Sequence, residues 1–189
     1  NRRESITVTQ YAWRQDAPLS VRRKCLDLNA KRGKMPDPFQ QENADKEELT
    51  LNPEAALSLL VSRAQNLAED PARRIAMGLA GGPGVGKSTL AEEMVKTLNG
   101  IRPGSAALVP MDGFHLRHAK LEALGIARDK GAAHTFEGAE FTEFLTRLKS
   151  ARGPVSGPGY SRKIEDVVED AFTVAPETKI LVVEGNYLL

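Results

Sequence analysis

The amino-acid sequence predicts an α/β fold, in which a doubly wound parallel sheet is flanked by helices. Three observations predict this fold. Short apolar runs alternate with segments whose apolar residues recur at helical spacing. One of the runs, "ILVVEG", is apolar on both faces, as expected for a strand that is covered on both sides. A glycine-rich segment, "GGPGVGKS", joins another run to a helical segment.

The expected elements follow one another from residue 52 onwards. Asn52 can cap a first helix, Pro53 suits its first turn, and Pro71 ends it. A strand over residues 75–80 and a helix that stops near residues 99–100 come next. A strand over 106–111, helices over 116–124 and 140–149, and a third strand over 179–185 follow. The glycine- and proline-rich stretch "ARGPVSGPGY" predicts a loop.

The composition is that of an ordinary globular protein. The 189 residues suffice for one α/β domain with an extension, and 41% are hydrophobic and 27% charged. A net charge of +1 gives no whole-molecule field for nucleic acid or membranes, and no apolar run is long enough to cross a bilayer. The single cysteine, Cys25, excludes an intramolecular disulfide and is compatible with a reducing compartment. We therefore expect a cytoplasmic protein.

Residues 1–50 differ in composition from the rest of the chain. Residues 1–34 carry nine Lys or Arg against three acidic residues, and residues 33–50 have the polar, proline-containing sequence of a linker. A basic leader of this kind is typical of a targeting segment, a nucleic-acid-binding arm or a solvated tail. We predict a basic extension and linker over residues 1–50, which leaves organelle targeting as an alternative, and a folded domain over residues 51–189.

The segment "GGPGVGKS" fits the pattern G-x-x-x-x-G-K-[ST] between an expected strand and an expected helix. Its glycines let backbone N–H groups converge on phosphate oxygens, and the helix amino terminus adds a favourable potential. Lys87 would bridge the β and γ phosphates of ATP, and Ser88 would ligate Mg²⁺. ATPases, GTPases, kinases and switches share this loop. The expected phosphate-binding residues are Gly81, Gly82, Gly84, Val85, Gly86, Lys87, Ser88 and Thr89.

Two carboxylates stand at the ends of apolar runs. Glu184 ends the third expected strand, beside the phosphate loop, where a carboxylate acts on magnesium or its water shell. Its alternative is a strand-end acid that faces solvent. Asp112 ends the second strand and could hold a metal, accept the proton of a substrate hydroxyl, or open a turn with Gly113. These residues alone do not decide whether Asp112 acts as a base or forms a turn.

His115 and His118 are spaced so that both could lie on one helix face and bind a metal. A catalytic metal site needs a third ligand, and the sequence identifies none. We expect His115 to hydrogen-bond the substrate and His118 to face solvent.

Five segments occur in order: "GGPGVGKST", "PMDGFHL", "GIARDKGAAHTFE", "PGYSRKIEDVVED" and "ILVVEGNYLL". Together they resemble the family of P-loop small-molecule kinases that contains uridine kinase, phosphoribulokinase and bacterial-type pantothenate kinase. The likeness covers residues 76–189. "MDGF", "TFE" and "YS" are most similar to the pantothenate kinases, and "EGNYLL" to the fructose-transport kinases. The resemblance implies a P-loop NTPase fold, with the amino-terminal part of a kinase domain over residues 51–189.

The resemblance also implies roles for single residues. Lys87 and Asp112 become the catalytic residues, with Asp112 as the base or hydroxyl-orienting group, and Ser88 and Glu184 serve the metal. Arg162 stands where pantothenate kinases have histidine, and this permanent cation favours an anionic or polyol substrate over pantothenate. The family's pattern "GxPxTFD" is also altered here, with Ala133 in place of the proline and Glu137 in place of the aspartate. The expected substrate-side residues are His115, Phe136, Tyr160 and Arg162.

Members of this family continue with two further strands, a basic lid helix and a segment that packs on adenine. Their strand order, 2-3-1-4-5, would leave residues 75–80 at an exposed edge, which favours aggregation or pairing, for example in a homodimer. We expect the 189-residue chain by itself to fold marginally and to phosphorylate poorly.

The predicted function is an ATP- and Mg²⁺-dependent kinase that transfers the γ-phosphate to a hydroxyl of a small polar metabolite. Pantothenate-like, nucleoside-like and sugar-like acceptors all fit this prediction. The alternative is a nucleotide-binding regulatory or assembly protein that performs no transfer. No platform of aromatic and basic residues for nucleic acid is evident in the core, so we expect neither a nucleic-acid nor a membrane partner.

Overall fold

A computed structural model describes residues 6–9, 48–70 and 73–188, with the backbone alone for residues 6–9 and 48–50. Two compact units divide the chain, and their boundary lies between Leu59 and Leu60, within α1 (Pro53–Leu67). The candidate site lies in the second unit, residues 60–188.

The first unit contains a two-stranded antiparallel ribbon of β1 (Ile6–Thr9) and β2 (Glu48–Leu51), with Ile6 opposite Leu51. The linker predicted over residues 33–50 is therefore wrong for residues 48–50. Their pairing is with a distant segment, which local composition does not reveal, and residues 33–47 lie outside the described chain. Helix α1 begins as predicted, because the N–H of Ala55 donates to Asn52 Oδ1 at 2.8 Å.

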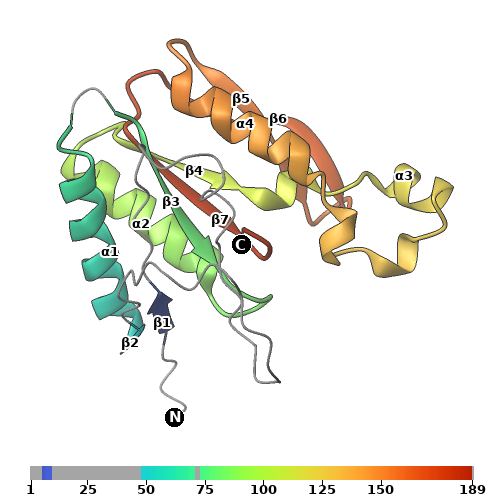
Figure 1. Cartoon of the computed structure of the whole chain (residues 1–189), viewed down its shortest axis with the longest axis horizontal. Coiled ribbons are helices and arrows are strands. Elements are labelled where there is room, and N and C mark those ends of the chain that lie inside the picture. The colour runs from blue at the N-terminus through green and yellow to red at the C-terminus, as the bar shows by residue number, and fades with distance from the viewer. Residues whose placement is uncertain (1–5, 10–47, 71–72, 189) are drawn as a thin grey trace, which may run out of the picture. The chain divides into compact units, whose positions relative to one another are not determined.

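The second unit is built on a parallel sheet of β3 (Ile75–Ala80), β4 (Ala106–Pro110) and β7 (Ile180–Gly185), in the order β3-β7-β4 (Figure 1). All residues of β7 are buried, which explains why its sequence is apolar on both faces. Among the described strands, β3 pairs with β7 alone, so the expected exposed edge is confirmed there.

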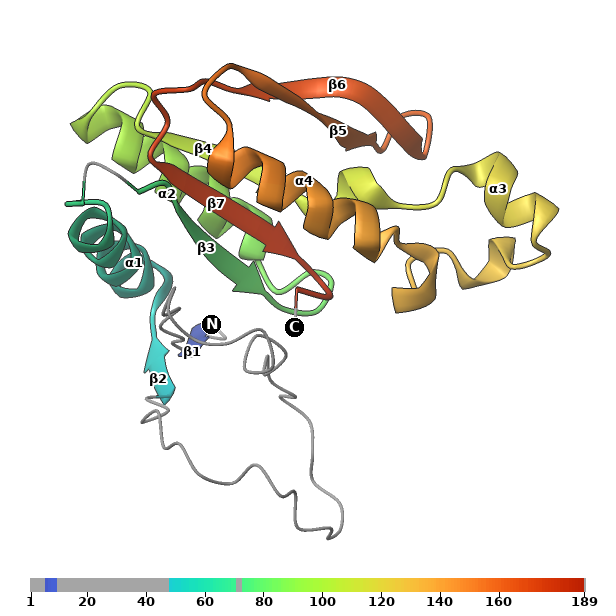
Figure 2. The same ribbon diagram turned by 45° about the horizontal axis from the view of Figure 1, so that its top comes forward.

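Helices cover both faces of this sheet (Figure 2). On one face, α2 (Lys87–Ile101) contacts β7 and β4 and buries Ala91, Met94 and Leu98. On the other, α4 (Gly138–Ser150) buries an apolar stripe against the strands. Burial of each such large side chain stabilises the fold by about 1.5–3 kcal/mol. The main cluster on that face comprises Val109, Met111, Phe114, Phe136, Phe141, Phe144, Leu148, Val174, Leu181 and Val183.

An antiparallel hairpin of β5 (Val155–Ser161) and β6 (Asp166–Val174) follows α4. The loop predicted for residues 151–160 is therefore wrong from Val155 onwards. Pro158 stands where the register shifts between Gly157 and Gly159, so its missing N–H falls at an interruption of the ladder. A local turn signal was overridden by pairing with β6.

A lobe of short elements connects β4 to α4: η2 (Met111–Phe114), α3 (His118–Ala123), η3 (Ala127–Asp129) and η4 (Ala133–Thr135). The helix expected over residues 116–124 is thus shorter than predicted. Two backbone hydrogen bonds of 2.8 Å close the lobe, from Leu116 N–H to Thr135 O and from Glu137 N–H to Phe114 O.

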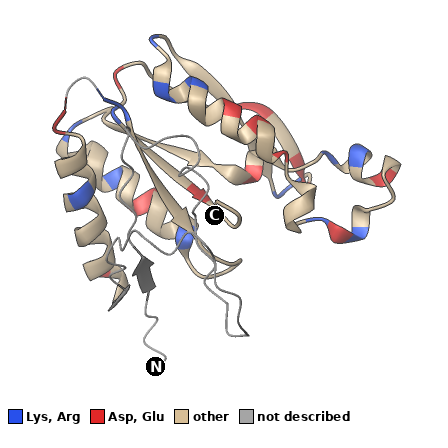
Figure 3. Cartoon of the chain, viewed as in Figure 1, with Lys and Arg blue, Asp and Glu red and all other residues tan. Residues whose placement is uncertain are grey.

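Acidic and basic residues are interspersed over the elements of the second unit (Figure 3), in keeping with the net charge of +1. Over the described ranges, no helix combines the length and apolar content that crossing a bilayer requires.

Candidate active site

The loop between β3 and α2 exposes backbone N–H groups. Gly84 and Gly86 have φ angles of 75° and 86°, a left-handed conformation that side chains disfavour. The N–H groups of residues 84–88 donate no hydrogen bond within the described chain. Among the described residues, the Lys87 ammonium makes one long contact, of 3.4 Å, with Gly82 O. This arrangement forms a cradle for an anion at the amino terminus of α2.

Glu184 lies beside this cradle. In the register of the sheet it is opposite Leu79 of β3 and Pro110 of β4, and its side chain is only 5% exposed. The hydroxyl of Ser88 donates to Glu184 Oε2 at 3.0 Å, so the strand end and the loop are in direct contact. The alternative of a strand-end acid that faces solvent is therefore excluded, because both faces of β7 are covered.

Burial raises the pKa of the Glu184 carboxyl above its ordinary value. The hydrogen bond from Ser88 lowers this pKa, the negative charge of Asp112 raises it further, and the positive charge of Lys87 lowers it. Within the protein alone, the ionised form of Glu184 is thus disfavoured. A cation bound at this point would favour it.

Asp112 lies in the single 3-10 turn η2, directly beyond β4. It is half-buried, and its carboxylate accepts no hydrogen bond from the part of the chain that the structure describes. Pro110, which precedes η2, is opposite Glu184 in the register of the sheet, so both carboxylates belong to the same end of the sheet. A turn is therefore present, while the role of the carboxylate itself stays a prediction.

Gly113 fixes this turn against the hairpin. A Cβ atom at Gly113 would lie 2.1 Å from the carbonyl oxygen of Pro158 and 2.9 Å from the backbone nitrogen of Gly159. No side chain fits into such a contact, so glycine is required for close approach of two backbones. The position of Asp112 consequently depends on β5, an element that the sequence did not reveal.

Three of the predicted substrate-side residues lie together. The rings of His115 and Phe136 are 3.9 Å apart between centroids, and those of His115 and Tyr160 are 5.1 Å apart. His115 Nδ1 is 2.8 Å from the backbone oxygen of Asp112, which links this cluster to η2. Arg162 is exposed at the turn of the β5–β6 hairpin and forms no ion pair with any described residue.

Two residues that the sequence reasoning did not select also belong to this end of the sheet. The ring of Tyr187 lies 5.4 Å from that of Phe136, and its hydroxyl donates to Gly131 O at 2.9 Å. Asn186 precedes it and follows β7 directly. Both lie in the quoted segment "EGNYLL", and their place just after a strand-end acid was the available signal.

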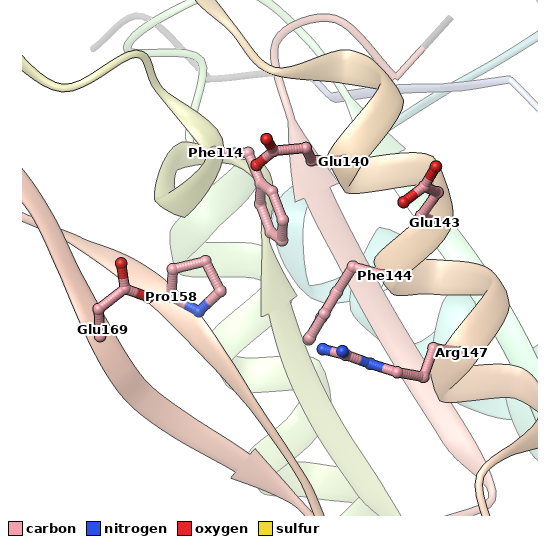
Figure 4. Close-up of a pocket in the computed structure, with 7 residues that line it drawn as sticks. All are labelled: Phe114, Glu140, Glu143, Phe144, Arg147, Pro158 and Glu169. Carbon is pink, nitrogen blue, oxygen red and sulfur yellow. The ribbon is translucent and has the colours of Figure 1, made fainter. Parts of the chain in front are cut away.

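A separate hollow of about 510 Å³ opens between α4, η2 and the hairpin (Figure 4). Its floor includes Phe114, and Arg147 lies over the ring of Phe144, 5.3 Å from the centroid. It contains none of the predicted site residues. The lining residues are Phe114, Glu140, Glu143, Phe144, Arg147, Pro158 and Glu169.

The residues at the carboxyl-terminal end of the sheet fit a magnesium–nucleotide complex. Within the described ranges, no group of three or more His, Cys, Asp or Glu is placed to bind a metal on its own. Mg²⁺ is commonly bound by one or two protein oxygens together with phosphate oxygens. A buried carboxylate in contact with a P-loop serine, beside unpaired loop N–H groups, matches that pattern.

Known proteins with similar sequences support this interpretation. The chain is 37% identical over 124 residues to the "putative uridine kinase" C227.14 of Schizosaccharomyces pombe, an alignment that covers 62% of this chain and 52% of that protein. It is 32% identical over 153 residues to the pantothenate kinase of Bradyrhizobium sp., over 76% of this chain and 48% of that protein. These similarities support the assignment of the chain to the P-loop kinases.

A solved P-loop kinase structure agrees with this assignment. The "putative fructose transport system kinase" of Silicibacter sp. TM1040 superimposes with a TM-score of 0.63 at 36% sequence identity, over 70% of this chain and 64% of that one. No protein-family model matches the chain. This P-loop kinase chain spans about half the length of the curated relatives just named.

Proposed function

We propose that the protein is a kinase that transfers the γ-phosphate of ATP to a hydroxyl group of a small polar metabolite. The observation that carries the proposal is the contact between Ser88 and Glu184, with Asp112 at the same end of the sheet. A phosphate loop, a buried metal-side acid and a second carboxylate to which no described residue donates are the groups that phosphoryl transfer to a hydroxyl requires. The kinase relatives support the same reaction class.

Each group has a distinct task in this proposal. The N–H groups of the loop and Lys87 bind the phosphates, and Ser88 and Glu184 hold Mg²⁺, which neutralises charge on the phosphate oxygens when bound. Asp112 accepts a hydrogen bond from the substrate hydroxyl, orients it in line, and takes its proton as the new P–O bond forms. The ring cluster of His115, Phe136 and Tyr160 supplies an apolar and hydrogen-bonding wall for the acceptor.

The test measures ADP release by the full-length protein with Mg²⁺ and ATP in the presence of uridine, pantothenate, D-glycerate or D-fructose. We expect one class of acceptor to raise turnover and to be recovered as a phosphate ester. Lys87→Ala should abolish this turnover. Lys96→Ala, on the exposed face of the same helix beside Glu93, should not change it and serves as the matched control. Equal turnover with and without every acceptor would instead indicate a nucleotide-binding protein that performs no transfer.

A further inference from the structure

Asn186 carries a buried polar atom that the chain itself does not satisfy. Its side-chain oxygen, Oδ1, is shielded from solvent, and no described residue donates a hydrogen bond to it. A buried acceptor without a donor costs about 1–3 kcal/mol of stability. Such atoms are rare in native proteins, and each one needs a physical reason.

The position of Asn186 supplies a reason. Along the chain it stands between Glu184, which accepts the hydrogen bond of Ser88, and Tyr187, which contacts Phe136. Asn186 lies in the bend directly beyond β7, the central strand of the sheet, whose neighbours β3 and β4 lead into the phosphate loop and into Asp112. Asn186 therefore belongs to the same end of the sheet as Glu184, the phosphate loop and Asp112.

The chemistry of Asn186 Oδ1 limits which groups can bind to it. A carboxamide oxygen only accepts hydrogen bonds, so its partner must be a donor. Phosphate and carboxylate oxygens are also acceptors and therefore cannot pair with it. The carboxylate of Asp112, at the same end of the sheet, is a second acceptor to which no described residue donates. Two side-chain acceptors without donors among the described residues match a ligand that brings two donors.

We propose that Asn186 is a substrate-binding residue whose Oδ1 accepts a hydrogen bond from a second hydroxyl of the acceptor molecule, the first being the hydroxyl that Asp112 orients. This inference rests on the proposed kinase function and deepens it, because it requires a substrate with at least two hydroxyl groups. A compound with one hydroxyl would leave a buried acceptor unpaired, which is a strong basis for discrimination.

The test compares the wild-type protein with Asn186→Ala, using full-length protein and pairs of acceptors that differ by one hydroxyl. The pairs are uridine with 2′-deoxyuridine or 3′-deoxyuridine, and D-glycerate with 3-hydroxypropanoate. We expect Asn186→Ala to raise the KM of the two-hydroxyl acceptor about tenfold, the effect of roughly one lost hydrogen bond, with the KM of ATP within about twofold. Removal of the second hydroxyl should cost the wild type the same factor and the variant almost nothing.

A second measurement separates binding from a structural role. Because no described residue donates to Oδ1, Asn186→Ala should leave the melting temperature of the protein without substrate unchanged or raise it. Asn66→Ala, at an exposed position of α1, serves as the control for both measurements. A lowered melting temperature, an unchanged acceptor KM, or losses that add independently for the variant and the missing hydroxyl would each overturn the proposal for Asn186 alone. Absence of transfer by the wild type to every acceptor would overturn the proposed function, and this inference with it.

Discussion

The two ends of the parallel sheet treat their polar groups differently. At the amino-terminal end, Asn99 and Ala106 exchange two hydrogen bonds of 2.9 and 3.0 Å, and the hydroxyl of Ser105 donates to Leu98 O at 3.2 Å. Arg74 donates to four carbonyl oxygens at 2.5–3.1 Å, those of Leu148, Ala175, Pro176 and Thr178.

At the carboxyl-terminal end, polar groups are left without protein partners. Asn186 Oδ1 is buried and unpaired within the described chain, the loop N–H groups of residues 84–88 have no acceptor there, and the pKa of Glu184 is raised by burial. The fully paired end holds the strands together. At the carboxyl-terminal end, unpaired polar groups lower stability. Such a loss of stability is usual where polar groups are kept available for a ligand, as in the proposed site.

The largest expected effect tests the proposed site at the carboxyl-terminal end of the sheet. Asp112→Asn removes the proton acceptor while it keeps the size of the side chain, so kcat should fall about 10²- to 10⁴-fold. Binding of ATP, measured by calorimetry on the full-length protein, should change less than about twofold. Asp170→Asn, at an exposed position of β6, should leave both quantities unchanged. If Asp112→Asn instead abolished ATP binding, Asp112 would belong to the metal site or the fold.

The next effect tests the paired end. Arg74→Ala leaves four carbonyl groups without a charged donor and should lower the free energy of unfolding by about 2–3 kcal/mol. Its neighbour Arg73 makes a single exposed salt bridge to Asp70 at 3.1 Å, so Arg73→Ala should cost less than about 1 kcal/mol. Urea titration of both variants gives the two values. Equal losses would show that the hydrogen bonds of Arg74 add nothing specific.

A smaller effect tests whether the β5–β6 hairpin positions the turn η2, which carries Asp112. Gly113→Ala forces η2 away from β5, because the new Cβ would lie 2.1 Å from Pro158 O, and should destabilise the protein by about 1–3 kcal/mol. It should also lower kcat, since Asp112 moves with the turn. Gly138→Ala, at the start of α4 with no atom near the added Cβ, should be neutral or stabilising by up to about 1 kcal/mol. An unaffected kcat in Gly113→Ala would mean that Asp112 is not positioned by this contact.

The parallel sheet and helix α2 could be predicted from the sequence better than the β5–β6 hairpin. The three parallel strands and the helix after the loop followed from apolar spacing, because each is determined by its own residues. The hairpin was missed because Pro158 and two flanking glycines indicate a loop, whereas pairing with β6 and contact with Gly113 are non-local.

The site divides in the same way. The phosphate loop and Glu184 could be predicted because a spacing rule and a strand end determine where they lie. Asn186 and Tyr187 could not, since the value of a buried unpaired oxygen or a ring contact appears only after folding. For Arg162, a contact with substrate stays a prediction.

The smallest effect is a pH dependence that belongs to the unpaired end. Because the pKa of Glu184 is raised in the folded protein, its contribution to stability is full below the unfolded pKa and is lost as pH rises through the folded value.

Glu184→Gln keeps an acceptor for Ser88 but never ionises. Without Mg²⁺ and nucleotide, this variant should therefore melt above the wild type at pH 7–8 and with it near pH 4, as followed by circular dichroism. Glu177→Gln, in the exposed turn before β7, should track the wild type at both pH values. Addition of Mg²⁺ and ATP should reverse the order at pH 7–8, because the ionised carboxylate of the wild type then gains the cation that it lacks in the free protein. A Glu184→Gln variant less stable than the wild type at every pH would place Glu184 with the fully paired groups at the opposite end of the sheet.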